Sequence, residues 1–196
     1  HDHIIDGVAM TCNDYFCFQQ RIFMHKNQGP VYYNDYLMLD QLLTSQEPMS
    51  KKYATKENPE AHDEMLFVIV HQSYELWFKQ ILHDLNSVMA IFSKPKVEDN
   101  DFGFIIQRLG RITQIQTAML PYLGILETMT PMDFLEFRSL LMPASGFQST
   151  QFREIEIKLG LSTNDRESID REFFLGRLTE KDRDRLIKLE TTPSLL

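Results

Sequence analysis

The sequence lacks several features that would place it in familiar classes of protein. Its 196 residues contain no apolar run of about 18 or more residues, so we expect no membrane-spanning helix. Lysine and arginine number 20 against 28 aspartates and glutamates, and the net charge of −8 argues against a broad nucleic-acid-binding surface. The chain also has no glycine-rich phosphate-binding loop and no H-E-x-x-H motif. We therefore expect neither nucleic acid nor a membrane as a partner.

Cysteine is almost absent. Cys12 and Cys17 are too few for a disulfide framework or a four-cysteine zinc site, and whether they pair with each other is open. Reduced thiols in the cytoplasm are the default expectation. The first residues lack the basic and apolar regions of a secretory signal, which also predicts a cytoplasmic location. The chain begins at His1 and stops on an apolar pair, so we expect both ends to be internal to a longer protein.

Helical periodicity is what the sequence does contain, and strand-like alternation of useful length is missing. A hydrophobic content of 43% with 11% aromatic residues is typical of a packed helical interior or of a pocket for a flat ligand. We predict an all-α helical bundle with an N-terminal arm (1–30) and one helical domain (31–196). The expected helices cover 35–45, about 59–92 and 99–126, then a short helix after Thr130, one that ends at Gly160, and a last one after Thr179.

The central stretch is residues 62–80, HDEMLFVIVHQSYELWFKQ, the first half of the longest predicted helix. Its apolar residues fall on two stripes of helical spacing, and the second stripe places His71 among aromatic rings. The two stripes are Leu66, Val70, Trp77 and Ile81, and Phe67, His71, Tyr74 and Phe78. A helix that is apolar on two faces is expected at the centre of its domain. His71 is then sheltered from water, and periodicity leaves open whether it is a structural or a functional residue.

Arg138 is the second residue of interest. It shares a helix face with Phe134 and precedes the small-residue turn Pro143-Ala144-Ser145-Gly146. An arginine among aromatic rings requires an anionic partner, and its planar fork suits a carboxylate. That carboxylate belongs either to one of the many acidic residues of this chain or to a ligand, and the sequence physics leaves both possibilities open.

No metal site is predicted from the residues. His62, Asp63 and Glu64 are consecutive, and adjacent positions of a helix point in different directions, so these three side chains cannot converge on one ion. Asp63 and Glu64 are better explained as partners of the helix dipole in a first turn.

Three segments together resemble the tryptophan 2,3-dioxygenase family. They are YNDYLMLDQLL (33–43), the central stretch (62–80) and LETMTPMDFLEFRSLLMPASGFQSTQFREIEIKLG (126–160). The resemblance implies an all-α dioxygenase that uses haem (iron protoporphyrin IX). With O2 it would open the indole ring of L-tryptophan to give N-formylkynurenine, the first step of tryptophan catabolism through the kynurenine pathway.

The resemblance also implies roles for individual residues. The run Phe67, Val68, Ile69, Val70 and His71 would line the substrate pocket on the distal side of the haem. His71, the expected catalytic residue, would lie near the indole nitrogen and not on the iron.

Further along the chain, Arg138 would bind the substrate carboxylate, and Phe134 would flank the substrate. Ser145 and Gly146 would lie close to the haem. Tyr33 and Tyr36 match tyrosines that reach into a neighbouring subunit, which implies a homotetramer with exchanged N-terminal segments.

One departure from the family pattern concerns the iron. None of the six histidines matches the proximal ligand, which is expected beyond Leu196. Two alternatives therefore accompany the tryptophan dioxygenase hypothesis. One is a relative that oxygenates a different indole, and the other is a haem-free helical module that acts in assembly or regulation.

Overall fold

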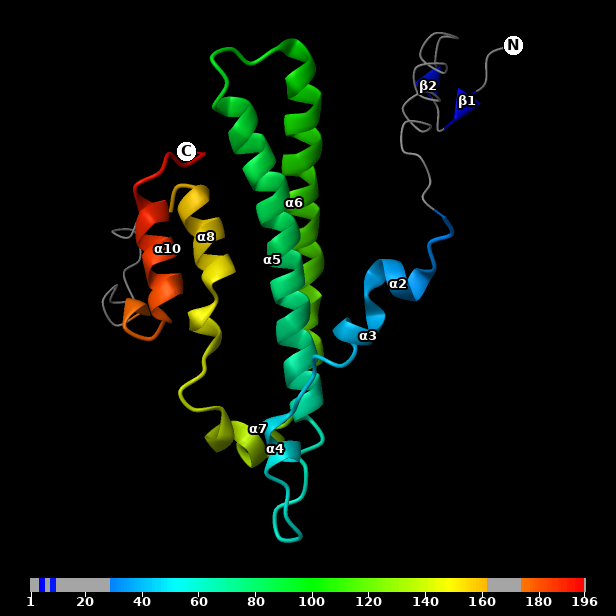
Figure 1. Ribbon diagram of the computed structural model, residues 1–196, viewed down its shortest axis with the longest axis vertical. Helices are drawn as coiled ribbons and strands as arrows, with labels where there is room; N and C mark the ends of the chain where they lie inside the picture. The colour runs from blue at the N-terminus through cyan, green and yellow to red at the C-terminus, as the bar shows by residue number, and fades with distance from the viewer. Residues whose placement is uncertain (1–3, 6–7, 10–28, 162–173, 196) are drawn as a thin grey trace. The chain divides into compact units, whose positions relative to one another are not determined.

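The computed structural model describes residues 4–5, 8–9, 29–161 and 174–195, and the chain divides into two compact units (Figure 1). The first unit is His1–Ser45 and the second is Gln46–Leu196. The unit that holds the N-terminal residues thus extends past the boundary predicted at residue 30. His1, His3, Cys12 and Cys17 lie outside the described residues.

The first unit contains a minimal strand pair and two short helices. The strands β1 (Ile4–Ile5) and β2 (Val8–Ala9) pair antiparallel, with Ile4 opposite Ala9. The helices are α2 (Tyr33–Leu37) and α3 (Leu39–Leu42). A single helix over 35–45 was the wrong prediction, because Met38 adopts a left-handed conformation with φ of 51° and separates the two.

Two long helices form the body of the second unit. Helices α5 (Glu64–Phe92) and α6 (Asp99–Leu126) run side by side in Figure 1 and share a core. The fully buried members of that core are Ile81, Leu82, Leu85, Ile112, Ile115, Met119 and Ile155. Polar contacts join the same two helices, since Arg111 donates to the buried Asp84 carboxylate at 3.0 Å. The all-α prediction is confirmed.

Tyr74 connects the middle of α5 to α6. Its hydroxyl donates to the carbonyl of Met119 at 2.9 Å, and its ring meets Tyr122 edge-on. Burial, reinforced by the neighbouring Tyr122, raises the pKa of Tyr74. The hydroxyl therefore stays protonated as a hydrogen-bond donor.

Two shorter helices cover another side of α5. Helix α8 (Thr150–Lys158) packs on α5, and α10 (Glu180–Glu190) packs on α8. Helix α10 begins after Thr179, as the sequence predicts, with Thr179 as its N-cap. Ser149 caps the start of α8, and the positive φ of Gly160 follows the predicted end of α8. Within the described ranges, no helix has both the length and the apolar content needed to cross a membrane.

The start of α5 differs from the prediction. The chain forms turns until Asp63, so Asn58-Pro59 does not begin the helix. Glu64, the first residue of α5, is buried and accepts hydrogen bonds from backbone N–H groups at the start of α4 (Met49–Lys52). Glu64 thus partners a helix dipole as expected, but the dipole is that of α4.

Helix α7 (Pro131–Arg138) begins with a complete capping box. The Thr130 hydroxyl accepts from the N–H of Asp133, and the Asp133 carboxylate accepts from the N–H of Thr130. The Thr130 hydroxyl also donates to the Asp133 carboxylate. This bond, and after it the bond from the Thr130 N–H, lowers the pKa of Asp133. Two 3-10 turns follow, η1 (Ser139–Leu141) and η2 (Gly146–Gln148), and they bring the chain back to α8.

Candidate functional site

A cavity of about 680 Å³ opens beside the N-terminal half of α5. Its lining combines one face of α5 with α7 and the two 3-10 turns after α7. The lining residues are Phe67, Val68, His71, Gln72, Glu75, Phe134, Arg138, Leu141, Ala144, Ser145, Gly146, Gln148 and Ser149. This volume lies within the range of about 300–1,000 Å³ that small-molecule sites occupy.

Aromatic rings form one wall of this cavity. The rings of Phe67 and Phe134, from α5 and α7, have centroids 5.7 Å apart. Phe137 lies behind both of them at 5.5 Å, edge-on to each, and is completely buried. Edge-to-face aromatic contacts of this kind fix ring orientation as well as burying area. The cavity therefore has an aromatic wall that is braced from behind, suited to an apolar ring.

His71 lies one helical turn after Phe67 on the same face of α5. Its Nδ1 is 2.7 Å from the carbonyl oxygen of Phe67, and the two ring centroids are 4.1 Å apart with the ring planes tilted by 37°. Because a carbonyl oxygen can only accept, Nδ1 carries the proton in this contact. In the neutral ring Nε2 is then a hydrogen-bond acceptor. His71 therefore makes a structural hydrogen bond through Nδ1, and its Nε2 is still available to a ligand.

Arg138 brings a positive charge to the same cavity. Its guanidinium lies over the Phe134 ring at 5.8 Å, and Nη1 is 3.4 Å from the carbonyl oxygen of Ala144. Within residues 29–161 and 174–195, no carboxylate forms an ion pair with it. A half-buried guanidinium without a carboxylate is a site for an anion.

The turn after α7 closes the cavity with small residues. The Ser145 hydroxyl accepts from the N–H of Phe147, and the Ser145 N–H donates to the Gln148 side chain at 2.9 Å. The space beside Gly146 is open, with no atom within 4 Å of the position of a side-chain carbon. The backbone here can approach a flat group closely.

The structure brings most of the predicted site residues together. Phe67, Val68, His71, Phe134, Arg138, Ser145 and Gly146 all line the cavity. Ile69 and Val70 do not, because Ile69 points to the surface with 46% of its area exposed and Val70 is buried elsewhere. Tyr33 and Tyr36 belong to the first compact unit and are exposed there.

Six lining residues were not predicted as site residues from the sequence: Gln72, Glu75, Leu141, Ala144, Gln148 and Ser149. Gln148 and Leu141 come from the turns, and Glu75 comes from α5, where its carboxylate accepts from Gln151 at 2.7 Å. Glu75 follows His71 by four residues, so its place on the cavity face of the helix was readable from spacing.

The cavity wall fits one side of a haem pocket. It offers an aromatic surface, an open approach at Gly146 and an imidazole whose Nε2 is available. Of the described histidines, His62 and His83 are exposed and do not line the cavity. The described part of the chain has no group of three or more side chains that could hold a metal ion.

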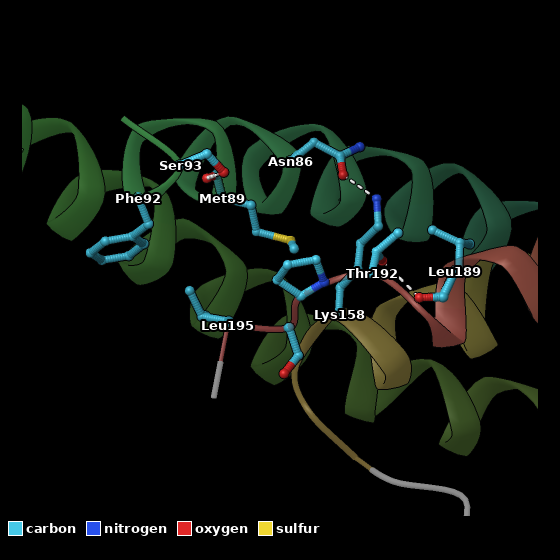
Figure 2. Close-up of a pocket in the computed structure, with 10 residues that line it drawn as sticks. Asn86, Met89, Phe92, Ser93, Lys158, Leu189, Thr192 and Leu195 are labelled. Carbon is cyan, nitrogen blue, oxygen red and sulfur yellow. Dashed lines mark hydrogen bonds between the residues drawn. The ribbon is translucent and has the colours of Figure 1, made fainter. Parts of the chain in front are cut away.

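A second cavity, of about 580 Å³, lies at the other end of α5 (Figure 2). Met89 and Phe92 of α5 face Leu195 and the segment after α10 across it. Its cation, Lys158, already has a partner, since Nζ lies 2.7 Å from Glu154 and also donates to the Asn86 side chain. The cation that lines this second cavity is therefore engaged by a carboxylate of the chain itself.

Comparison with known proteins agrees with the chemistry of the first cavity. The family model described as tryptophan 2,3-dioxygenase matches residues 19–196. The tryptophan 2,3-dioxygenase of Alteromonas mediterranea is 52% identical over 172 residues, which are 88% of this chain and 46% of that protein. The enzyme of Dictyostelium discoideum is 50% identical over 169 residues, covering 86% of this chain and 41% of that protein.

The enzyme of Bdellovibrio bacteriovorus is 48% identical over 166 residues, covering 85% of this chain and 45% of that protein. The chain thus spans a little under half the length of these relatives. The matched region includes the cavity and both long helices, and the chain belongs to the tryptophan 2,3-dioxygenase family.

Proposed function

We propose that this chain is part of a haem-dependent dioxygenase that opens the indole ring of L-tryptophan with O2 to give N-formylkynurenine. The observation that carries the proposal is the Arg138 guanidinium, which lies in an aromatic cavity without a carboxylate partner among the described residues. A planar substrate that carries its own carboxylate satisfies both features of this cavity.

Four of the cavity residues have roles in binding the substrate. Arg138 binds the substrate carboxylate with its planar fork, and the rings of Phe67 and Phe134 flank the indole. His71 accepts from the indole N–H through Nε2 while its Nδ1–H stays on the Phe67 carbonyl. Together these contacts orient the ring and exclude water from one face, which is the protein's share of the rate enhancement.

Haem is the proposed cofactor, and Ser145 and Gly146 would lie against it. When bound, the haem iron supplies the oxygen chemistry that amino-acid side chains cannot perform. This chain's own contribution is the wall on the substrate side, where small residues leave room beside a flat group.

The proposal extends to the assembly and its location. We propose a cytoplasmic homotetramer in which Tyr33 and Tyr36 of one subunit complete the substrate pocket of a neighbour. Both tyrosines are more than 70% exposed within their own unit, so their rings are available for contact with another chain.

The test uses the full-length enzyme loaded with haem and compares binding of L-tryptophan with binding of tryptamine, which lacks the carboxylate. Loss of two charge-assisted hydrogen bonds in Arg138→Met should weaken tryptophan binding by about 100-fold and leave tryptamine binding nearly unchanged. Arg108→Met is the matched control, because Arg108 lies over the Phe104 ring at 5.2 Å on α6 and does not line the cavity.

Equal loss of affinity for both ligands would contradict the role of Arg138. Tight tryptamine binding by the unaltered enzyme would favour a relative that acts on a different indole. Failure of the full-length protein to take up haem would favour the haem-free helical module.

A further inference from the structure

Glu64 is a buried carboxylate that the proposed chemistry does not use. Its exposed fraction is 1%, and its two oxygens accept from the backbone N–H groups of Met49 at 2.8 Å and Ser50 at 2.7 Å. In the described part of the chain it forms no ion pair with a lysine, arginine or histidine. The carboxylate is therefore balanced by the first N–H groups of α4 alone.

Two further bonds attach the same segment, residues 46–52, to the region around the start of α5. The buried Ser50 hydroxyl accepts from the N–H of Ala61 at 3.0 Å. Gln46 donates from Nε2 to the side-chain oxygen of Gln72 at 2.7 Å, and Gln72 lines the cavity. Segment 46–52 is thus held at Gln46 by Gln72 and at residues 49–50 by Glu64 and Ala61.

Segment 46–52 contacts η1, and η1 in turn lines the proposed substrate site. Helix α4 packs against η1, and in Figure 1 α4 lies with α7 at the same end of α5. Arg138 is the N-cap residue that directly precedes η1, and Leu141 at the end of η1 lines the cavity. The backbone that carries the guanidinium is therefore supported from outside the cavity by α4.

We propose that Glu64 is a positioning residue for substrate binding, because it holds α4 against η1 and so fixes the place of Arg138. The inference rests on the proposed function, since it assigns Glu64 a part in recognising the substrate carboxylate. A glutamine at this position keeps the size of the side chain but has one acceptor oxygen for two N–H donors. Its NH2 group would face a backbone N–H, and α4 would be displaced.

The experiment measures dissociation constants for L-tryptophan and tryptamine in the full-length haem enzyme, with Glu64→Gln as the variant. A misplacement of about 1 Å can cost up to about 100-fold, so we expect the preference for tryptophan to fall about tenfold. Asp84→Asn is the matched control, since Asp84 is equally buried on α5 but bonds to Gln80 and Arg111. It should lower the unfolding temperature without changing the preference.

Hydrogen exchange of the same proteins supplies a readout that is independent of turnover. Peptides that cover residues 139–148 should exchange faster in Glu64→Gln than in Asp84→Asn. An unchanged ligand preference in Glu64→Gln, with Arg138→Met still abolishing it, would overturn the positioning role alone. Absence of any preference in the unaltered enzyme would instead overturn the proposed function.

Discussion

The two ends of α5 carry cavities of similar size and different chemistry. The cavity beside Phe67 measures about 680 Å³ and the one beside Met89 about 580 Å³, and each is lined by one cation. Arg138 in the first forms no ion pair in the described part of the chain, whereas Lys158 in the second is paired with Glu154. The two cavities are therefore similar in volume and differ in whether the lining cation already has a carboxylate partner.

The largest expected effect concerns the aromatic wall, which is backed only at the first cavity. Phe137 is completely buried behind Phe67 and Phe134, so Phe137→Ala should lower the free energy of unfolding by about 3–5 kcal/mol. Phe92 lines the second cavity with 48% of its area exposed, and Phe92→Ala should cost less than about 1 kcal/mol. Both losses of unfolding free energy are measured by urea denaturation. Equal losses in the two variants would contradict this difference between the cavities.

An intermediate effect is expected at Lys158. Its side chain and that of Glu154 are 11% and 6% exposed, so Lys158→Met leaves a buried carboxylate with Arg185 as its remaining partner. We expect a loss of about 1–3 kcal/mol in the free energy of unfolding. Tryptophan affinity should stay the same, in contrast to Arg138→Met. A change in tryptophan affinity would show that the two cavities are not independent.

The smallest effect is a pH dependence at the start of α7, a helix that contributes to the first cavity. The pKa of Asp133 is lowered by the Thr130 hydroxyl and N–H, so the ionised carboxylate stabilises the start of α7. Because the folded pKa lies below the unfolded one, the stabilisation is complete above about pH 4 and is lost as the pH falls through the folded pKa. Unfolding curves of Asp133→Asn and the unaltered protein should therefore converge in acid. A difference that persists at the lowest pH would refute the capping role.

Local signals in the sequence predicted some boundaries correctly. Thr130-Pro131-Met132-Asp133 contains its own cap, and α7 begins where that motif predicts. The start of α5 was missed because Glu64 bonds to residues 49 and 50, a contact that no local pattern encodes. Met38 gave no signal either, since a left-handed residue is expected to be glycine or asparagine.

Helical spacing in the sequence predicts part of the candidate site, and tertiary contacts determine the rest. Phe67 and His71 share a helix face by spacing, and the cavity joins them to Arg138 from a distant segment, as the family resemblance implied. Five consecutive helical residues cannot all face one cavity, and Ile69 and Val70 accordingly lie off it. Phe137 was overlooked because spacing cannot tell a ring that lines a cavity from one that supports it.

The wall of the first cavity also bears on the order of folding. Phe67 and Phe134 touch across 67 residues of chain, whereas Glu64 and Ser50 bond across only 14. Loop closure costs entropy that grows with separation, so the contact between α4 and α5 is expected to form first. The pocket would then appear only when α7 docks, and a newly synthesised chain would be unable to bind substrate until that late step.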